Sequence, residues 1–268
     1  MDRMTRSFQL VAQSYRVLMQ DKELMLLPLA SGAVMTVVVA IFVLGSGINA
    51  ATIEVEGPAL YVPAFFMYVA LYAVGIFFQC AVVAGATERM RGGDPTIVTA
   101  LAAASRHIVR IIIWACLAAT VGMALRAIQD RVGFLGKLVV GLIGAAWSLA
   151  TFFVVPVLVL EDIYIGDVLG RSVEIFKEHW GETMVGGASL GFAAFCAWVV
   201  LGIATALLVS AVGMPGLVLL VVGGLFLMIF FSTLEGVYLA SLYRFATEGE
   251  VPPGFDKAVL QAAFVEKD

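Results

Sequence analysis

Six long apolar stretches divide the chain, with short polar or glycine- and proline-containing segments between them. A helix needs about 20 apolar residues to cross the hydrocarbon core of a bilayer. Because backbone polar groups inside a membrane must be hydrogen bonded, we interpret the stretches as helices. The expected spans are roughly residues 24–44, 61–84, 108–127, 138–160, 184–211 and 217–243. Gly213-Met214-Pro215-Gly216 predicts a turn between the last two.

Segments with one apolar side precede the first, third and fifth spans. The clearest has its apolar residues spaced as on one face of a helix, at Ile165, Val168, Leu169, Val173, Phe176 and Trp180. Similar patterns occupy residues 8–18 and 97–108, and residues 254–266 begin a fourth after the last span. Aromatic side chains favour the membrane–water interface, so Trp180, Phe176 and Tyr15 are the candidate interface residues.

One plan, an amphipathic helix followed by a span, an outer loop and a second span, therefore occurs three times, over about residues 5–87, 95–160 and 164–245. A Phe-Phe pair lies in each even span, at 77–78, 152–153 and 230–231, and Ser14, Ser105 and Ser172 occupy similar places. Three parallel repeats imply pseudo-three-fold symmetry about the membrane normal, with the amphipathic helices forming a cytoplasmic collar. Alternatively, the pattern reflects only the alternation common to all multi-span chains. The predicted fold is one all-α membrane domain over residues 1–268.

Composition excludes several classes of protein. Of the 268 residues, 62% are apolar and 13% are charged, and the mean hydropathy is +1.01. Soluble domains are about 45–50% apolar and about a quarter charged. The net charge of -4 also argues against a basic surface. We therefore expect a protein embedded in the lipid bilayer, neither soluble nor disordered, and not a partner of nucleic acid.

The basic residues predict the orientation. Thirteen of the 16 Lys and Arg residues fall in one alternating set of connecting and terminal segments. Only Arg126, Arg131 and Lys137 fall in the other set, and the first outer loop carries Glu54 and Glu56 but no basic residue. Positive loops stay in the cytoplasm. Both termini are therefore expected on the cytoplasmic side, in a prokaryotic inner membrane.

The chain lacks the residue patterns that enzymes and metal sites use. The 3 cysteines are dispersed through apolar runs, and the 2 histidines, His107 and His179, lie far apart with no cysteine nearby. There is no phosphate-binding GKS/T loop, GxSxG elbow or HExxH pair. We expect no enzymatic activity, no cofactor and no metal.

Glu235 is the most unusual residue, because it lies inside the sixth span, nine residues before Arg244. That spacing places it about 13 Å into the membrane at ~1.5 Å per residue. An acid there costs about 2.5–3.5 kcal/mol and should face protein or water. Ser232 and Tyr238 lie near its helix face, and Thr233 lies close by. A proton- or cation-binding site, a neutral glutamic acid that fastens helices together, and a shifted span all remain open.

Two other spans contain candidate functional residues. Gln79 follows its Phe pair as Glu235 follows its own, and Ser148 and Thr151 could join them in a polar centre. The alternative is ordinary hydrogen bonding between helices. Pro156 interrupts the fourth span and is a candidate hinge, although most such kinks only shape packing.

Short motifs in a fixed order carry a family resemblance. They are Phe77-Phe78-Gln79, Arg91-Gly92-Gly93-Asp94-Pro95, the run from Ala145 to Phe152, Pro156, Gly170-Arg171-Ser172 and Trp180-Gly181-Glu182. Together they resemble a family of uncharacterised prokaryotic six-span membrane proteins, domain of unknown function 6159. The resemblance covers nearly the whole chain and implies the fold. It transfers no catalytic or binding residue, and Gln79 stands where members have Asn.

Two functions therefore remain. The first is transport or binding of a small molecule, ion or lipid within the helix bundle, at Glu235, Gln79, Ser232, Thr233, Tyr238 and Ser148. The second is a non-catalytic structural or partner-binding subunit of a membrane complex, favoured by the lack of a dense polar pathway. The bilayer is the expected partner, and a homo-oligomer or another membrane protein stays open.

Overall fold

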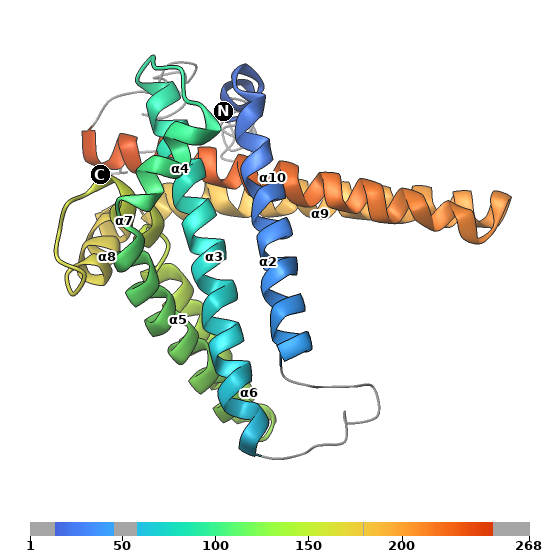
Figure 1. The fold of residues 1–268 in the computed structure, drawn as a ribbon, viewed down its shortest axis with the longest axis horizontal. Helices are drawn as coiled ribbons and strands as arrows, with labels where there is room; N and C mark the ends of the chain where they lie inside the picture. The colour runs from blue at the N-terminus through green and yellow to red at the C-terminus, as the bar shows by residue number, and fades with distance from the viewer. Residues whose placement is uncertain (1–13, 46–57, 179, 249–268) are drawn as a thin grey trace. The chain divides into compact units, whose positions relative to one another are not determined.

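The computed structural model describes residues 14–45, 58–178 and 180–248 (Figure 1). Within these ranges the chain forms helices and turns but no strand. Six segments are long and apolar enough to cross a membrane: Lys22–Gly45, Val62–Met90, Ile108–Gln129, Phe134–Leu160, Leu190–Val212 and Met214–Glu248. Each overlaps one predicted span. The prediction of an all-helical, multi-pass membrane protein is therefore confirmed.

The elements follow one another with short connections. In chain order they are η1 (Lys22–Met25), α2 (Leu26–Gly45), α3 (Pro58–Met90), α4 (Ile97–Ser105), α5 (Ile108–Gln129), α6 (Phe134–Ala150), α7 (Val154–Leu160), α8 (Val168–Glu178), α9 (Trp180–Val212), η2 (Met214–Gly216) and α10 (Leu217–Glu248). Residues 14–20 are also helical. With 33 and 32 residues, α3 and α10 continue beyond the predicted spans into polar sequence. Their polar ends carry most of the ion pairs described below.

The helices form two compact units. The central unit comprises Leu29–Ala84 and Val98–Glu174. In it, α5 and α6 pack together as a hairpin, and the rings of Trp114 and Trp147 stack with their centroids 6.1 Å apart. Gly122 of α5 lets α3 approach closely, because a Cβ atom there would lie 3.3 Å from the Tyr68 hydroxyl. Small residues serve this purpose in membrane helices generally.

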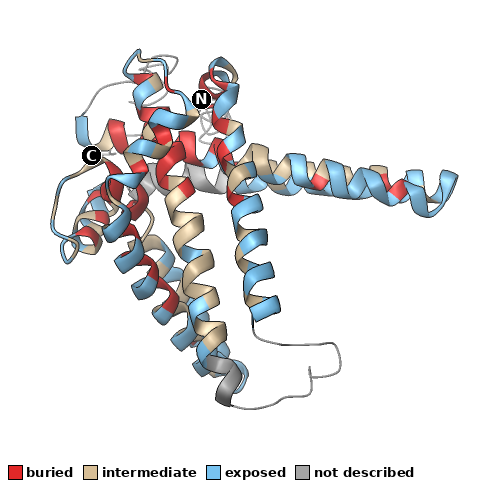
Figure 2. Ribbon diagram, viewed as in Figure 1, coloured by how far each residue is buried: buried red, intermediate tan, exposed pale blue. Residues whose placement is uncertain are grey.

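The terminal unit comprises Gly85–Ile97 and the described parts of Met1–Pro28 and Ile175–Asp268. Its main feature is the hairpin of α9 and α10, which run side by side (Figure 1). The predicted turn is present. Gly213 has φ +76°, a backbone conformation that favours glycine, and η2 follows it directly. From Leu190 onward the hairpin is exposed over most of its length, whereas residues 233–234 and 236–244 of α10 are buried (Figure 2).

The fourth span is broken into two helices. α6 ends at Ala150, a turn follows, and α7 begins at Val154. Pro156 therefore lies in the first turn of α7, where a missing N–H costs no helical hydrogen bond. The interruption itself falls just before Pro156, at Thr151–Phe153.

Three of the segments predicted to be amphipathic contain helical residues in the described chain: residues 14–18 of the first, α4 and α8. In α8 the buried residues are Val168, Ser172 and Ile175, one helical face, whereas Glu174 and Lys177 are exposed. Their location at a membrane surface, like the three repeats, stays a prediction. Most of the first amphipathic segment and all of the predicted tail at 254–266 lie outside the described residues.

Candidate functional site

Glu235 lies on the exposed side of α10, well inside a candidate membrane span. Ser232, one turn earlier, is exposed on the same side. The other two predicted site residues on this helix point elsewhere, since Thr233 is fully buried and Tyr238 is 2% exposed. The hydroxyl of Thr233 donates to the carbonyl of Ile229 at 2.7 Å, so its own helix uses it. The structure thus groups Glu235 with Ser232 and places Thr233 on the packed side.

Gln79 and Ser148 belong to the central unit, and Glu235 to the terminal unit. Gln79 is half-buried on α3. Ser148 is exposed on α6, and its hydroxyl donates to the carbonyl of Gly144 at 3.0 Å. Thr151 likewise donates to the carbonyl of Trp147, at 2.9 Å. The shared polar centre therefore stays a prediction.

The break before Pro156 is bridged by a side chain that no sequence argument singled out as functional. The hydroxyl of Ser172, on α8, accepts a hydrogen bond from the N–H of Phe153 at 3.1 Å. It also donates one to the carbonyl of Ala150 at 2.7 Å. Ser172 and Phe153 are both fully buried. The predicted hinge region is thus tied to a neighbouring helix.

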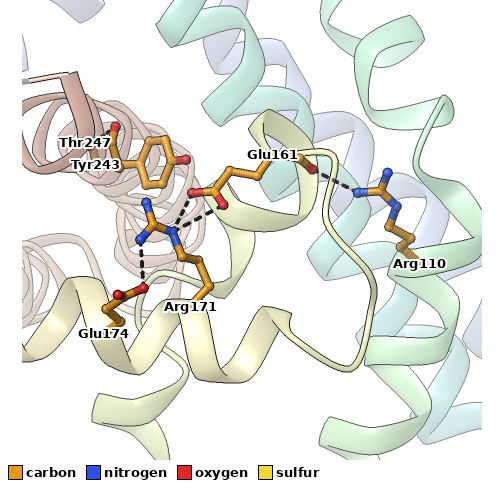
Figure 3. Close-up of polar contacts among 6 residues, drawn as sticks. All are labelled: Arg110, Glu161, Arg171, Glu174, Tyr243 and Thr247. Atoms are coloured by element: carbon orange, nitrogen blue, oxygen red, sulfur yellow. Dashed lines mark hydrogen bonds and ion pairs between the residues drawn. The ribbon is translucent and has the colours of Figure 1, made fainter.

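A network of charged side chains surrounds the end of α7 (Figure 3). The carboxylate of Glu161 accepts hydrogen bonds from the Arg171 Nε at 3.1 and 3.3 Å. Arg171 also pairs with Glu174 at 2.8 Å. From the start of α5, Arg110 donates to the backbone carbonyl of Glu161 at 2.9 Å and pairs with the carboxylate of Asp162. Three helices are therefore joined at the end of the fourth span.

The charges in this network stabilise one another. Hydrogen bonding to Glu174, and to Glu161, raises the pKa of Arg171 against the opposing effect of burial. Burial, helped by the positive charge of Arg110, lowers the pKa of the nearby His107. Arg171 therefore stays charged, while His107 tends to be neutral.

A second network holds the polar ends of the terminal unit together. Glu248, the last residue of α10, pairs with Arg91 at 2.7 Å and with Arg244 at 2.8 Å. Arg91 directly follows α3, so this carboxylate joins the end of the second span to the end of the sixth. The side chain of Arg244 is 4% exposed, whereas that of Arg91 is 58% exposed.

Arg89 forms a third set of contacts. It donates to the carbonyl of Gln20 at 2.9 Å and pairs with Asp94 at 3.0 Å. Its Nε lies 3.9 Å from the buried carboxylate of Asp21. Each arginine in the three sets thus has a carboxylate partner, and these ion pairs link segments at the ends of the spans. The sequence did not reveal these pairs, because charges between spans indicate orientation without indicating which residues meet.

The predicted interface residues differ in their exposure and contacts. Tyr15 is 44% exposed, and its ring packs against Phe230 of α10 with centroids 6.0 Å apart. Phe176 is half-buried on α8, and the side chain of Trp180 lies outside the described residues. No cluster of His, Cys, Asp and Glu suited to a metal ion occurs in the part of the chain that was described.

Comparison with known proteins identifies a family. No curated protein and no solved structure matches the chain. The family of unknown function DUF6159 matches residues 58–253, which include five of the six candidate spans and all three sets of ion pairs in part or whole. The match covers most of the chain and agrees with the resemblance carried by the ordered motifs. The chain therefore belongs to the DUF6159 family.

Proposed function

We propose that this multi-pass membrane protein binds or conducts a proton or a small cation, and that Glu235, assisted by Ser232, is the binding group. The observation that carries the proposal is the exposure of Glu235 in the interior of an apolar span. Neither Glu235 nor Ser232 has a hydrogen bond or an ion pair within the described chain.

A charged group inside a membrane carries a large free-energy cost. An ionised carboxylate at the centre of a membrane helix costs about 2.5–3.5 kcal/mol on insertion scales. At the ends of their spans, the carboxylates of Glu161 and Glu248 are compensated by pairing with arginine. Glu235 lacks such a partner in the described chain, so a proton, a cation or water must compensate it. A carboxyl and a hydroxyl oxygen one helical turn apart are suitable ligands for a hard cation or a proton.

The location of the protein, the orientation of its termini and the internal repeats belong to the same proposal. The chain lies in a prokaryotic inner membrane with both termini in the cytoplasm, as the distribution of basic residues favours. The chain also contains three helical repeats, each an amphipathic helix followed by two spans. Two contacts between repeats support this interpretation: Ser172 of the helix before the fifth span binds Phe153 of the fourth, and Tyr15, before the first span, packs on Phe230 of the sixth. We propose no catalytic step.

Carbodiimide labelling tests the role of Glu235. Dicyclohexylcarbodiimide is an apolar reagent that modifies protonated carboxyl groups inside membranes. Full-length protein in nanodiscs would be treated at several pH values and digested for mass spectrometry. We expect modification of Glu235 that slows as the pH rises and as a small cation is added in place of choline. Exposed Glu174 serves as the internal control. Absence of label on Glu235, or label that is insensitive to pH and cation, would overturn the proposal.

A second candidate is a structural subunit of a membrane complex. The observation in its favour is that hydroxyl groups in several spans donate to their own helix backbone, so they do not form a polar route. They are Thr36, Thr120, Ser148, Thr151, Ser210, Thr233 and Ser241. Native mass spectrometry in nanodiscs separates the two. A small molecule lost in Glu235→Ala or Gln79→Ala favours a binding site, whereas a bare protein in fixed stoichiometry with other chains favours the subunit.

A further inference from the structure

The break in the fourth span leaves two backbone groups without their usual helical partners. In a continuous helix, the N–H of Phe153 would donate to the carbonyl of Leu149, and that of Val154 to the carbonyl of Ala150. Instead, Phe152 donates to Leu149 at 3.3 Å and Val154 donates to Thr151 at 3.1 Å. The N–H of Phe153 and the carbonyl of Ala150 are therefore left over.

Ser172 supplies partners for both groups. Its hydroxyl accepts from the N–H of Phe153 at 3.1 Å and donates to the carbonyl of Ala150 at 2.7 Å. An unpaired backbone group in an apolar environment is costly, and a broken membrane helix persists where side chains satisfy the freed groups. Because Ser172 and Phe153 are fully buried, water does not readily replace the hydroxyl.

A second contact ties the other end of α7 to the same helix. Arg171 of α8 is hydrogen bonded to the carboxylate of Glu161, which directly follows α7. The side chain of Glu161 is 18% exposed and that of Arg171 is 35% exposed. α8 thus holds both ends of α7: Ser172 binds at the start of α7, and Arg171 binds at the end of α7.

We propose that α8 is a conformational strap that keeps the fourth span broken, with Ser172 as the residue that couples the two. When α8 is docked, the hydroxyl of Ser172 satisfies the break. When α8 moves away, Phe153 and Ala150 regain partners only if α6 and α7 join into a more continuous helix, which reorients Glu161 and the arginines bound to it. α8 leads into α9, so the chain connects this movement to the fifth span. The device stands independently of the proposed role of Glu235.

Hydrogen exchange at single-residue resolution, on the full-length protein in nanodiscs, tests the strap. We expect Ser172→Ala to speed exchange of the Phe153 amide about tenfold, the change expected from the loss of one buried hydrogen bond. Arg171→Gln keeps the Ser172 hydroxyl but loosens α8, and it should speed the same amide several-fold. The matched control is Ser105→Ala, because the Ser105 hydroxyl is exposed and donates to Leu101 of its own helix.

Three results would decide against the strap. The first is an unchanged Phe153 amide in Ser172→Ala, and the second is a change no larger than that in Ser105→Ala. The third is an Arg171→Gln protein in which Phe153 exchanges as in the wild type, since release of α8 would then have no effect on the break. If Ser172→Ala does not fold, the Arg171→Gln measurement decides alone. Faster exchange there supports the strap, and unchanged exchange overturns it.

Discussion

The ring of Tyr15 packs against the ring of Phe230, with centroids 6.0 Å apart and planes at 56°. Tyr15 precedes the first span, and Phe230 belongs to the Phe-Phe pair of the sixth. The contact therefore joins the beginning of the described chain to its last helix within the terminal unit. The sequence predicts Tyr15 as an interface residue, and the structure adds a packing role.

Removal of this ring should weaken the terminal unit. We expect Tyr15→Ala to lower the free energy of unfolding in detergent by about 1 kcal/mol, the order of an aromatic pair. Tyr164→Ala is the control, because Tyr164 is 76% exposed. Unfolding by SDS, followed by circular dichroism, measures both. Equal effects of the two variants would mean that the contact with Phe230 contributes nothing.

The two arginines on Glu248 should differ in their contributions. Arg244→Ala removes a side chain that is 4% exposed, so we expect a loss of about 3 kcal/mol or more, typical of a broken buried pair. Arg91→Ala removes one that is 58% exposed and should cost about 1 kcal/mol or less. The same unfolding titration gives both values. An Arg91→Ala variant as unstable as Arg244→Ala would contradict this ranking.

Asp21 should make stability depend on pH. Burial raises the pKa of its carboxyl above the ordinary 3.8, although Arg89 acts in the opposite direction. The folded state therefore binds the proton more tightly than the unfolded state. The contribution of Asp21 to stability is greatest below 3.8 and declines as the pH rises through the raised folded pKa. We expect Asp21→Asn to gain stability relative to the wild type over that rise.

Unfolding measured from acidic to neutral pH checks this sign. The control is Asp94→Asn, which removes the exposed carboxylate partner of the same Arg89. The prediction is contradicted if the free energy of unfolding of Asp21→Asn, relative to that of the wild type, stays constant or falls as the pH rises.

The α9–α10 hairpin depends on small residues at the contact. A Cβ atom on Gly224 would lie 3.1 Å from the Trp198 ring, whereas one on Gly202 would meet nothing within 4 Å. Gly224→Ala should therefore cost about 1–3 kcal/mol through overpacking. Gly202→Ala, in the neighbouring helix, should be neutral or slightly stabilising because alanine favours helices. Similar stabilities for the two variants would show that the ring moves aside freely.

Local pattern was sufficient to predict the spans and the turn at Gly213. Apolar length decides whether a helix can cross a bilayer, and a glycine at positive φ decides where the last hairpin turns. The pairing of Glu161 with Arg171 was not predictable in this way. It depends on how the chain folds back after α7. From the sequence, a charged residue between spans is equally consistent with a signal for orientation.

The fourth span is a second feature that local sequence pattern could not predict. The sequence places an interruption at Pro156, whereas the helix breaks just before it, at Thr151–Phe153. The reason is tertiary, because Ser172 satisfies the groups that the break exposes. Glu235 was conspicuous from its position alone. Its exposure alongside Ser232, with Thr233 packed away, required the structure.

Proton flux tests the role of Glu235 most directly. Protein would be reconstituted into liposomes that contain a pH-sensitive dye, and a potassium diffusion potential with valinomycin would drive protons inward. We predict acidification faster than in protein-free liposomes for the wild type and for Ser210→Ala, an exposed hydroxyl on α9 bonded to its own helix. Glu235→Gln, reconstituted to the same level, should fall to the protein-free rate. Wild-type flux no faster than that of empty liposomes, or Glu235→Gln flux equal to that of the wild type, would contradict proton conduction through Glu235.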